Sequence, residues 1–154
     1  MNYKQFFGRK AEVVAKDLLG RLIVRTTQRG VTAGKIIETG AYEGGKLTNS
    51  RRGMLYPPGS VFLMPFRGFQ LFNISTEAEY VPSCVEIRKL AFHDRTLEGA
   101  GAVSKALGIE KELDSVFFNS AGLEISGNAV EVDRIQKTGG EGLSENCLGY
   151  FSIK

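Results

Sequence analysis

Short segments rich in β-branched and aromatic residues recur along the chain, and turns that contain glycine separate them. Segments of this kind, bounded by turn residues, are typical of strands that pair antiparallel in one sheet. The sequence predicts strands at residues 22–27, 34–42, 61–64, 69–74, 83–90, 116–118, 123–125 and 130–135, and a last strand near the end of the tail. Because few helical segments interrupt them, we expect an α+β fold with a mostly antiparallel, curved sheet.

Two segments have the spacing of helices. Apolar residues at positions 13, 14, 15, 18 and 19 predict a helix over residues 12–19, and Gly20 follows it as a C-terminal cap. A second helix is predicted at residues 102–107, before Gly108. A chain of 154 residues is long enough for one sizeable core, so we expect a single domain over residues 1–154.

The composition disfavours several classes of protein. Hydrophobic residues make up 42% of the chain and charged residues 24%, which is ordinary for a soluble globular protein. No apolar run approaches the ~18 residues of a membrane span, and the first residues lack the apolar core of a signal peptide. Cys84 and Cys147 are too few for a disulfide framework, and a single histidine, His93, argues against a zinc site. We therefore expect no metal site and a cytoplasmic location.

The net charge of +3 is mild, but basic residues are placed among aromatic ones. Arg51 and Arg52 are adjacent in a loop over residues 43–60, and long loops in compact domains are often functional. Residues 61–74 are predicted to form a protruding β-hairpin whose tip, PFRG, carries Phe66 and Arg67. Cations contact phosphates and rings stack on bases, so this arrangement favours a nucleic acid as the partner.

Six segments resemble, in the same order, the motifs of one enzyme family. They are FFGRKAEVVAKDLLGRLIV, GKIIETGAYEGG, NSRRGM, PPGSVFLMPFRGFQLFNI, CVEIRKL and GAGAVSKALGI, and the resemblance extends from Phe6 to about Ile135. Each motif is weak alone, but their order and spacing together are specific. The chain is identified by this resemblance as a member of the alkyladenine/3-methyladenine DNA glycosylase family.

The resemblance implies a base-excision repair enzyme. Such an enzyme binds duplex DNA that contains a damaged base, flips an alkylated purine out of the stack and hydrolyses its N-glycosidic bond. No lysine occupies a matched pocket position, so a monofunctional glycosylase without a lyase step is expected. We also expect a monomer that needs no cofactor, no membrane and no obligate protein partner. In a prokaryote we expect it to be associated with the nucleoid.

The resemblance also assigns roles to residues on the predicted sheet. Tyr42 matches a tyrosine that stacks on the flipped base, Asn73 an asparagine near the purine edge, and Arg88 an arginine beside the reacting centre. The hairpin position of a second stacking tyrosine falls near Phe62, Leu63 or Met64.

The outer residues are assigned to DNA. Phe66 or Arg67 at the hairpin tip would fill the space that the flipped base leaves, unless the tip is an ordinary exposed turn. Arg51, Arg52 and Lys105 would contact phosphates, Lys105 beside the glycine-rich start of the second helix. That start is alternatively only a turn that begins the helix.

Two positions depart from the family pattern. Gly40 stands where the family has its general-base glutamate, and Asn49 stands where it has a histidine. Strand alternation places residues 38, 40 and 42 on one face, so Glu38 is a candidate substitute, or else the partner of a strand arginine. Two hypotheses follow: a glycosylase with weakened chemistry, which a cationic alkylated purine would tolerate best, or an inactive protein that binds damaged DNA. A third reading is reuse of the fold for RNA or a small ligand.

Overall fold

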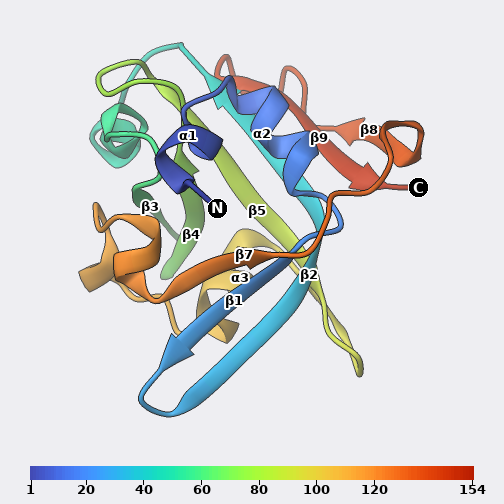
Figure 1. Ribbon diagram of the computed structural model, residues 1–154. Helices are drawn as coiled ribbons and strands as arrows, with labels where there is room; N and C mark the ends of the chain where they lie inside the picture. The colour runs from blue at the N-terminus through green and yellow to red at the C-terminus, as the bar shows by residue number, and fades with distance from the viewer.

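The computed structural model describes residues 1–154, and its centre is one nine-stranded sheet (Figure 1). Every strand pair is antiparallel, which confirms the predicted α+β fold. The strands are β1 Leu22–Thr27, β2 Gly30–Glu43, β3 Val61–Phe66, β4 Phe69–Ser75, β5 Ser83–Ala91, β6 Thr96–Glu98, β7 Leu123–Ser126, β8 Ile135–Gly139 and β9 Cys147–Ile153. The main path of the sheet runs β3-β4-β5-β2-β1-β7. In addition, β6 pairs with β5, β9 pairs with β2, and β8 pairs with β9.

Three α-helices and four 3₁₀ helices connect and cover these strands. The α-helices are α1 Tyr3–Phe7, α2 Ala11–Leu18 and α3 Ala100–Ala106, so both predicted helices are confirmed. The 3₁₀ helices are η1 Asn49–Leu55, η2 Lys111–Leu113, η3 Phe118–Ala121 and η4 Val132–Arg134. None of the helices has the length and apolar character needed to span a membrane.

Two predicted strands are wrong. Residues 116–118 form only one isolated bridge, between Phe117 and Ser60, because η3 begins at Phe118 and ends the pairing. Within residues 130–135, Val132–Arg134 form η4, and the strand starts only at Ile135. Val132 is 83% exposed, so the apolar residues of that segment do not share one buried face. The β-branched composition was misleading there because no neighbouring strand is available to pair.

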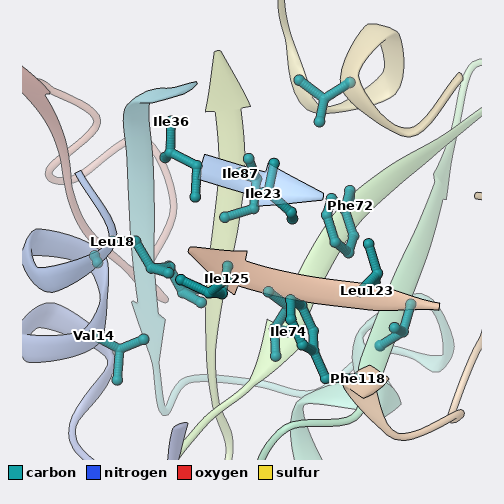
Figure 2. Close-up of a cluster of buried hydrophobic side chains, with 14 of the residues drawn as sticks. Val14, Leu18, Ile23, Ile36, Phe72, Ile74, Ile87, Phe118, Leu123 and Ile125 are labelled. Atoms are coloured by element: carbon teal, nitrogen blue, oxygen red, sulfur yellow. The ribbon is translucent and has the colours of Figure 1, made fainter. Parts of the chain in front are cut away.

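Alternation along the strands gives the sheet two different faces. On one face, Leu63, Phe72 and Ile87 are buried in a single apolar cluster, which α2 covers through Val14 and Leu18 (Figure 2). The Thr39 hydroxyl of β2 also donates a 2.7 Å hydrogen bond to the backbone carbonyl of Ala15 in α2. The residues between these core residues point to the opposite face, where η1 packs.

The hairpin β3–β4 has the tip that was predicted. Phe66 pairs with Phe69, and Arg67 and Gly68 make the connection with φ angles of 49° and 84°. Positive φ at both central residues is the requirement of the tight turns that match strand twist. Glycine meets this requirement easily, whereas a left-handed arginine is unusual. The turn therefore holds Arg67 outward at the end of the hairpin.

The division into faces predicts a large difference between two phenylalanines of this hairpin. Phe72→Ala should lower the free energy of unfolding by about 3–5 kcal/mol, because Phe72 is fully buried and its removal leaves a cavity. Phe66→Ala should cost about 1 kcal/mol or less, because Phe66 is 51% exposed. Urea unfolding of both variants measures the difference. Equal losses of unfolding free energy in the two variants would show that the hairpin does not pack on the core through the face that carries Phe72.

Candidate functional site

A row of side chains crosses the sheet on the face opposite the core. Phe62 of β3 pairs with Asn73 of β4, and Asn73 pairs with Glu86 of β5. Glu86 pairs in turn with Gly40 of β2, and Gly40 with Tyr150 of β9. Directly paired residues share a face and lie close together, so the register alone assembles this row from distant parts of the chain.

A narrow pocket lies over this row. Its open space is small, about 30 Å³, so a base can enter only if side chains move aside. Met64 is the flexible, half-buried side chain in its wall. The lining residues are Tyr42, Arg51, Met54, Phe62, Met64, Asn73, Cys84, Glu86 and Asn146.

The 3₁₀ helix η1 closes one side of this pocket by a close approach of backbone to ring. A Cβ at Gly53 would lie 2.0 Å from Cδ1 of Phe62, so only glycine allows η1 to pack here. The Ser75 hydroxyl donates a 2.7 Å hydrogen bond to the Gly53 carbonyl and holds the backbone at this distance. Met54, the next residue, then packs with Phe62 and Cys84.

Arg88 is held by two carboxylates and one ring. Its Nε donates to Glu38 Oε1 at 3.0 Å and its Nη1 to Glu86 Oε1 at 2.5 Å. Its guanidinium carbon lies 3.6 Å from the centre of the Tyr150 ring, a cation–π contact. Burial alone would lower the pKa of Arg88, but the charge of Glu86 and these hydrogen bonds raise it, so the arginine stays charged.

Glu86 is a functional-site candidate that the sequence reasoning missed. It is only 3% exposed, and burial raises its pKa even though Arg88 and a hydrogen bond from Tyr42 act in the opposite direction. Burial and the charge of Glu86 also raise the pKa of Tyr42, which therefore stays a donor, with its hydroxyl 3.3 Å from Glu86 Oε1. A charged residue between Val85 and Ile87 in a predicted strand was the available signal.

The space that a side chain at residue 40 would occupy is filled by its neighbours. A Cβ there would lie 3.1 Å from Cδ1 of Tyr150, 3.2 Å from Cε2 of Tyr42 and 3.3 Å from Cδ of Arg88. These contacts show that residue 40 faces the same side as Tyr42. All three neighbours are side chains, so the gap in the strand is closed by packing rather than left as a hole.

Glu38 is an ion-pair partner in this structure. The strand register shifts on both sides of it, and its carboxylate pairs with Arg88 and, at 3.4 Å, with Lys89. Glu38 does not line the pocket. Of its two predicted roles, the pairing with a strand arginine is the one that the structure contains.

The other predicted residues fall into two groups. Phe62, Met64 and Asn73 line the pocket, as Tyr42 does. Arg51, predicted to contact DNA, lines the pocket instead and donates a hydrogen bond to the buried side chain of Asn146. That asparagine lies in the tail, where no pattern indicated a site.

Asn49 lies outside this pocket. It is exposed at the start of η1, and its side-chain oxygen accepts a 3.3 Å hydrogen bond from Arg52. The structure therefore does not place residue 49 beside Tyr42, Asn73 and Glu86.

Exposed cations and rings surround the hairpin next to the pocket. Phe66 and Phe69 are 51% and 48% exposed, and Arg67 lies over the Phe66 ring at 5.1 Å. Arg52 is exposed on η1, and Lys105 is exposed on α3, in a hollow that also contains Phe69. Phe66 and Arg67, the two candidates for filling the space of a flipped base, are thus open to solvent. Arg52 and Lys105, two of the predicted phosphate contacts, are exposed around the same hairpin.

A second groove runs along the hairpin beside the pocket. It is lined by Phe66, Phe69, Leu71, Glu86, Arg88 and residues 98–102. Glu86 is the only residue that lines both this groove and the pocket. No group of three or more histidine, cysteine, aspartate or glutamate side chains with the spacing of a metal site is present.

Comparison with known proteins gives consistent matches. A family model described as methylpurine-DNA glycosylase (MPG) matches residues 5–146. A curated relative from Synechococcus elongatus is 36% identical over 68% of this chain and 60% of its own length. Relatives from Legionella pneumophila (strain Lens) and Latilactobacillus sakei are 33% and 35% identical, over 72% and 55% of this chain and 68% and 45% of their own lengths.

All three relatives carry the name "Putative 3-methyladenine DNA glycosylase". The chain spans about half to two thirds of the length of these relatives. The family model covers nearly the whole chain, and its matched region contains the hairpin, the pocket and Arg88. The chain therefore belongs to the methylpurine-DNA glycosylase family.

Proposed function

We propose that this protein is a monofunctional DNA glycosylase that releases cationic alkylated purines, of the 3-methyladenine type, from duplex DNA. The observation that carries the proposal is the meeting of Tyr42, Asn73 and Glu86 in one pocket, with Arg88 behind them and an exposed aromatic–basic hairpin beside them. Membership of the family and the names of the relatives support the same activity.

The pocket chemistry suits a flat cation. The rings of Tyr42 and Phe62 offer π faces, which attract a positively charged base more strongly than a neutral one. The buried carboxylate of Glu86 adds a negative charge at the same place. Asn73 presents an amide to the pocket, and an amide can distinguish bases by the hydrogen-bonding groups on their edge.

The hairpin suits the extrusion of a base. Unstacking a nucleotide costs a few kcal/mol, and an inserted side chain offsets part of that cost. Phe66 and Arg67 are exposed at the tip, and their stacking on one another keeps them together. Arg52 and Lys105, on η1 and α3, are exposed near the hairpin, where they would meet phosphates.

One observation favours a second candidate function. Residue 40 carries no side chain, and the family pattern places its general base there. A protein that binds damaged DNA without cutting it would also need the pocket and the hairpin. The two candidates differ in turnover and not in binding.

Base release is the test. Duplex DNA treated with a methylating agent should lose bases faster with the protein than by spontaneous loss. Tyr42→Ala should slow release by about 5- to 150-fold, since stacking on an aromatic ring contributes about 1–3 kcal/mol per base. Tyr80→Ala, at a 75% exposed tyrosine outside the pocket, should leave the rate unchanged.

The outcomes separate the candidates. Selective binding of methylated duplex without any release, even at high protein concentration, would replace the glycosylase by the binding protein. Equal binding of methylated and normal duplex would contradict both candidates and favour an unrelated ligand.

Affinity for duplex DNA should depend steeply on salt, because each neutralised phosphate releases counterions. Arg67→Ala and Lys105→Ala should each reduce the slope of log affinity against log salt by about 0.9. Lys4→Ala is the matched control, since Lys4 is exposed on α1 at the opposite, core side of the sheet. Fluorescence anisotropy over a salt series measures the slopes. A larger change in Lys4→Ala would place the DNA on the other face.

A further inference from the structure

Glu86 lies at the boundary between the pocket and the groove. It lines the pocket together with Tyr42 and Asn73, and the groove together with Phe66 and Phe69. A flipped base in the pocket remains joined to a sugar whose backbone lies outside it. With that backbone along the groove, the N-glycosidic bond crosses this boundary, within reach of the Glu86 carboxylate.

The two carboxylate oxygens of Glu86 have different surroundings. Oε1 accepts the hydrogen bonds from both Arg88 and Tyr42. Oε2 accepts none from the protein, yet it is not among the fully enclosed polar atoms that lack a partner. One oxygen thus fixes the side chain, and the other is free to accept a hydrogen bond from a water molecule.

Glu38 differs in this respect. Its Oε1 accepts from Arg88 at 3.0 Å, and its Oε2 lies 3.4 Å from the Lys89 ammonium. Both oxygens are engaged by cations, and Glu38 lines neither the pocket nor the groove. It can position Arg88, but no oxygen is left to activate water.

We propose that Glu86 is the catalytic residue that activates the attacking water, in place of a side chain at residue 40. The proposal rests on the glycosylase function proposed above and names the base of that reaction. Glu86 and Gly40 are direct partners in the β2–β5 ladder. Opposed residues have Cβ atoms about 4.5–5.5 Å apart, so a glutamate at either position reaches much the same space.

The step balances without any other reactant. The water proton passes to Glu86 Oε2 while the water oxygen bonds to C1′ of the sugar. The bond between C1′ and the base nitrogen breaks, and its electron pair neutralises the cationic purine. The products are a neutral free base and an abasic site with a hydroxyl at C1′, and Glu86 then returns its proton to solvent.

Single-turnover release from methylated duplex tests the proposal. Glu86→Gln should slow release 10²–10⁴-fold, the usual contribution of a general base, while lesion binding changes less than about tenfold. Glu86→Asp keeps the charge beside Arg88 but retracts the carboxylate by one methylene, so it should slow release at least tenfold. Glu38→Gln is the matched control and should slow release less than Glu86→Asp does.

Gly40→Glu combined with Glu86→Gln moves the carboxylate back across the ladder. This double variant should release bases at least tenfold faster than Glu86→Gln alone. The side chains nearest a Cβ at residue 40 belong to Tyr42, Arg88 and the half-exposed Tyr150, so these side chains must move to admit the glutamate.

The results separate this proposal from the proposed function. A wild-type protein that releases bases while Glu86→Gln and Glu86→Asp match its rate overturns the role of Glu86 and leaves the glycosylase intact. A wild-type protein that binds lesions without release overturns both. A larger decrease of the release rate in Glu38→Gln than in Glu86→Gln would assign the activation of water to Glu38.

The pH profile gives a second readout. A base must be deprotonated, so release should fall as pH drops through the pKa of Glu86, which lies above the ordinary value of about 4.3. Glu86→Gln should lose this acidic limb. The surrounding charged or titratable groups are Arg88 and Cys84 on β5, Glu38 and Tyr42 on β2, Tyr150 and Cys147 on β9, and Arg51 on η1. An unchanged limb in Glu86→Gln would contradict the assignment.

Discussion

The antiparallel pairing of β2 with β5 determines which side chains lie on the core face of the sheet and which lie on the pocket face. It places Ala41 opposite Val85 and Thr39 opposite Ile87 on the core face, under α2. The same register places Gly40 opposite Glu86 on the other face. A shift of one residue would exchange the two faces, bringing charged side chains into the core. The core therefore fixes the register, and the register fixes the site.

Arg88 allows charged groups to persist on that face. A buried carboxylate is costly unless a cation and hydrogen bonds compensate it. Arg88 compensates two carboxylates at once, one from each strand, and the Tyr150 ring covers its outer surface. The arrangement leaves a single carboxylate oxygen without a protein partner, on Glu86. The oxygen that we propose to activate water is thus the one that Arg88 and Tyr42 do not bind.

Most of the sheet could be predicted from the sequence, because alternation and turns are local properties. The hairpin tip at Arg67 and the common face of residues 38, 40 and 42 follow from them. The strands expected at residues 116–118 and 130–135 were wrong, since strand formation needs a partner that composition does not reveal. A segment can have the composition of a strand and still form only isolated backbone hydrogen bonds, as residues 116–118 do, instead of a continuous ladder.

The site was predictable only in part. Tyr42 and Asn73 follow from the resemblance, and the structure places both in the pocket. Glu86, Asn146 and Tyr150 did not follow, because their positions depend on pairing between strands far apart in the sequence. Asn49 and Arg51 show the same limit within a few residues, since the turn of η1 directs Arg51 inward and leaves Asn49 exposed.

The position of one water molecule tests the account most directly. A crystal structure of the protein bound to duplex DNA with a positively charged abasic-site analogue would show the groups around C1′. We expect a water that donates a hydrogen bond to Glu86 Oε2 and none to Glu38, with its oxygen facing C1′. A water held instead by Glu38, or an Oε2 that turns away from the sugar with no water beside it, would contradict the account.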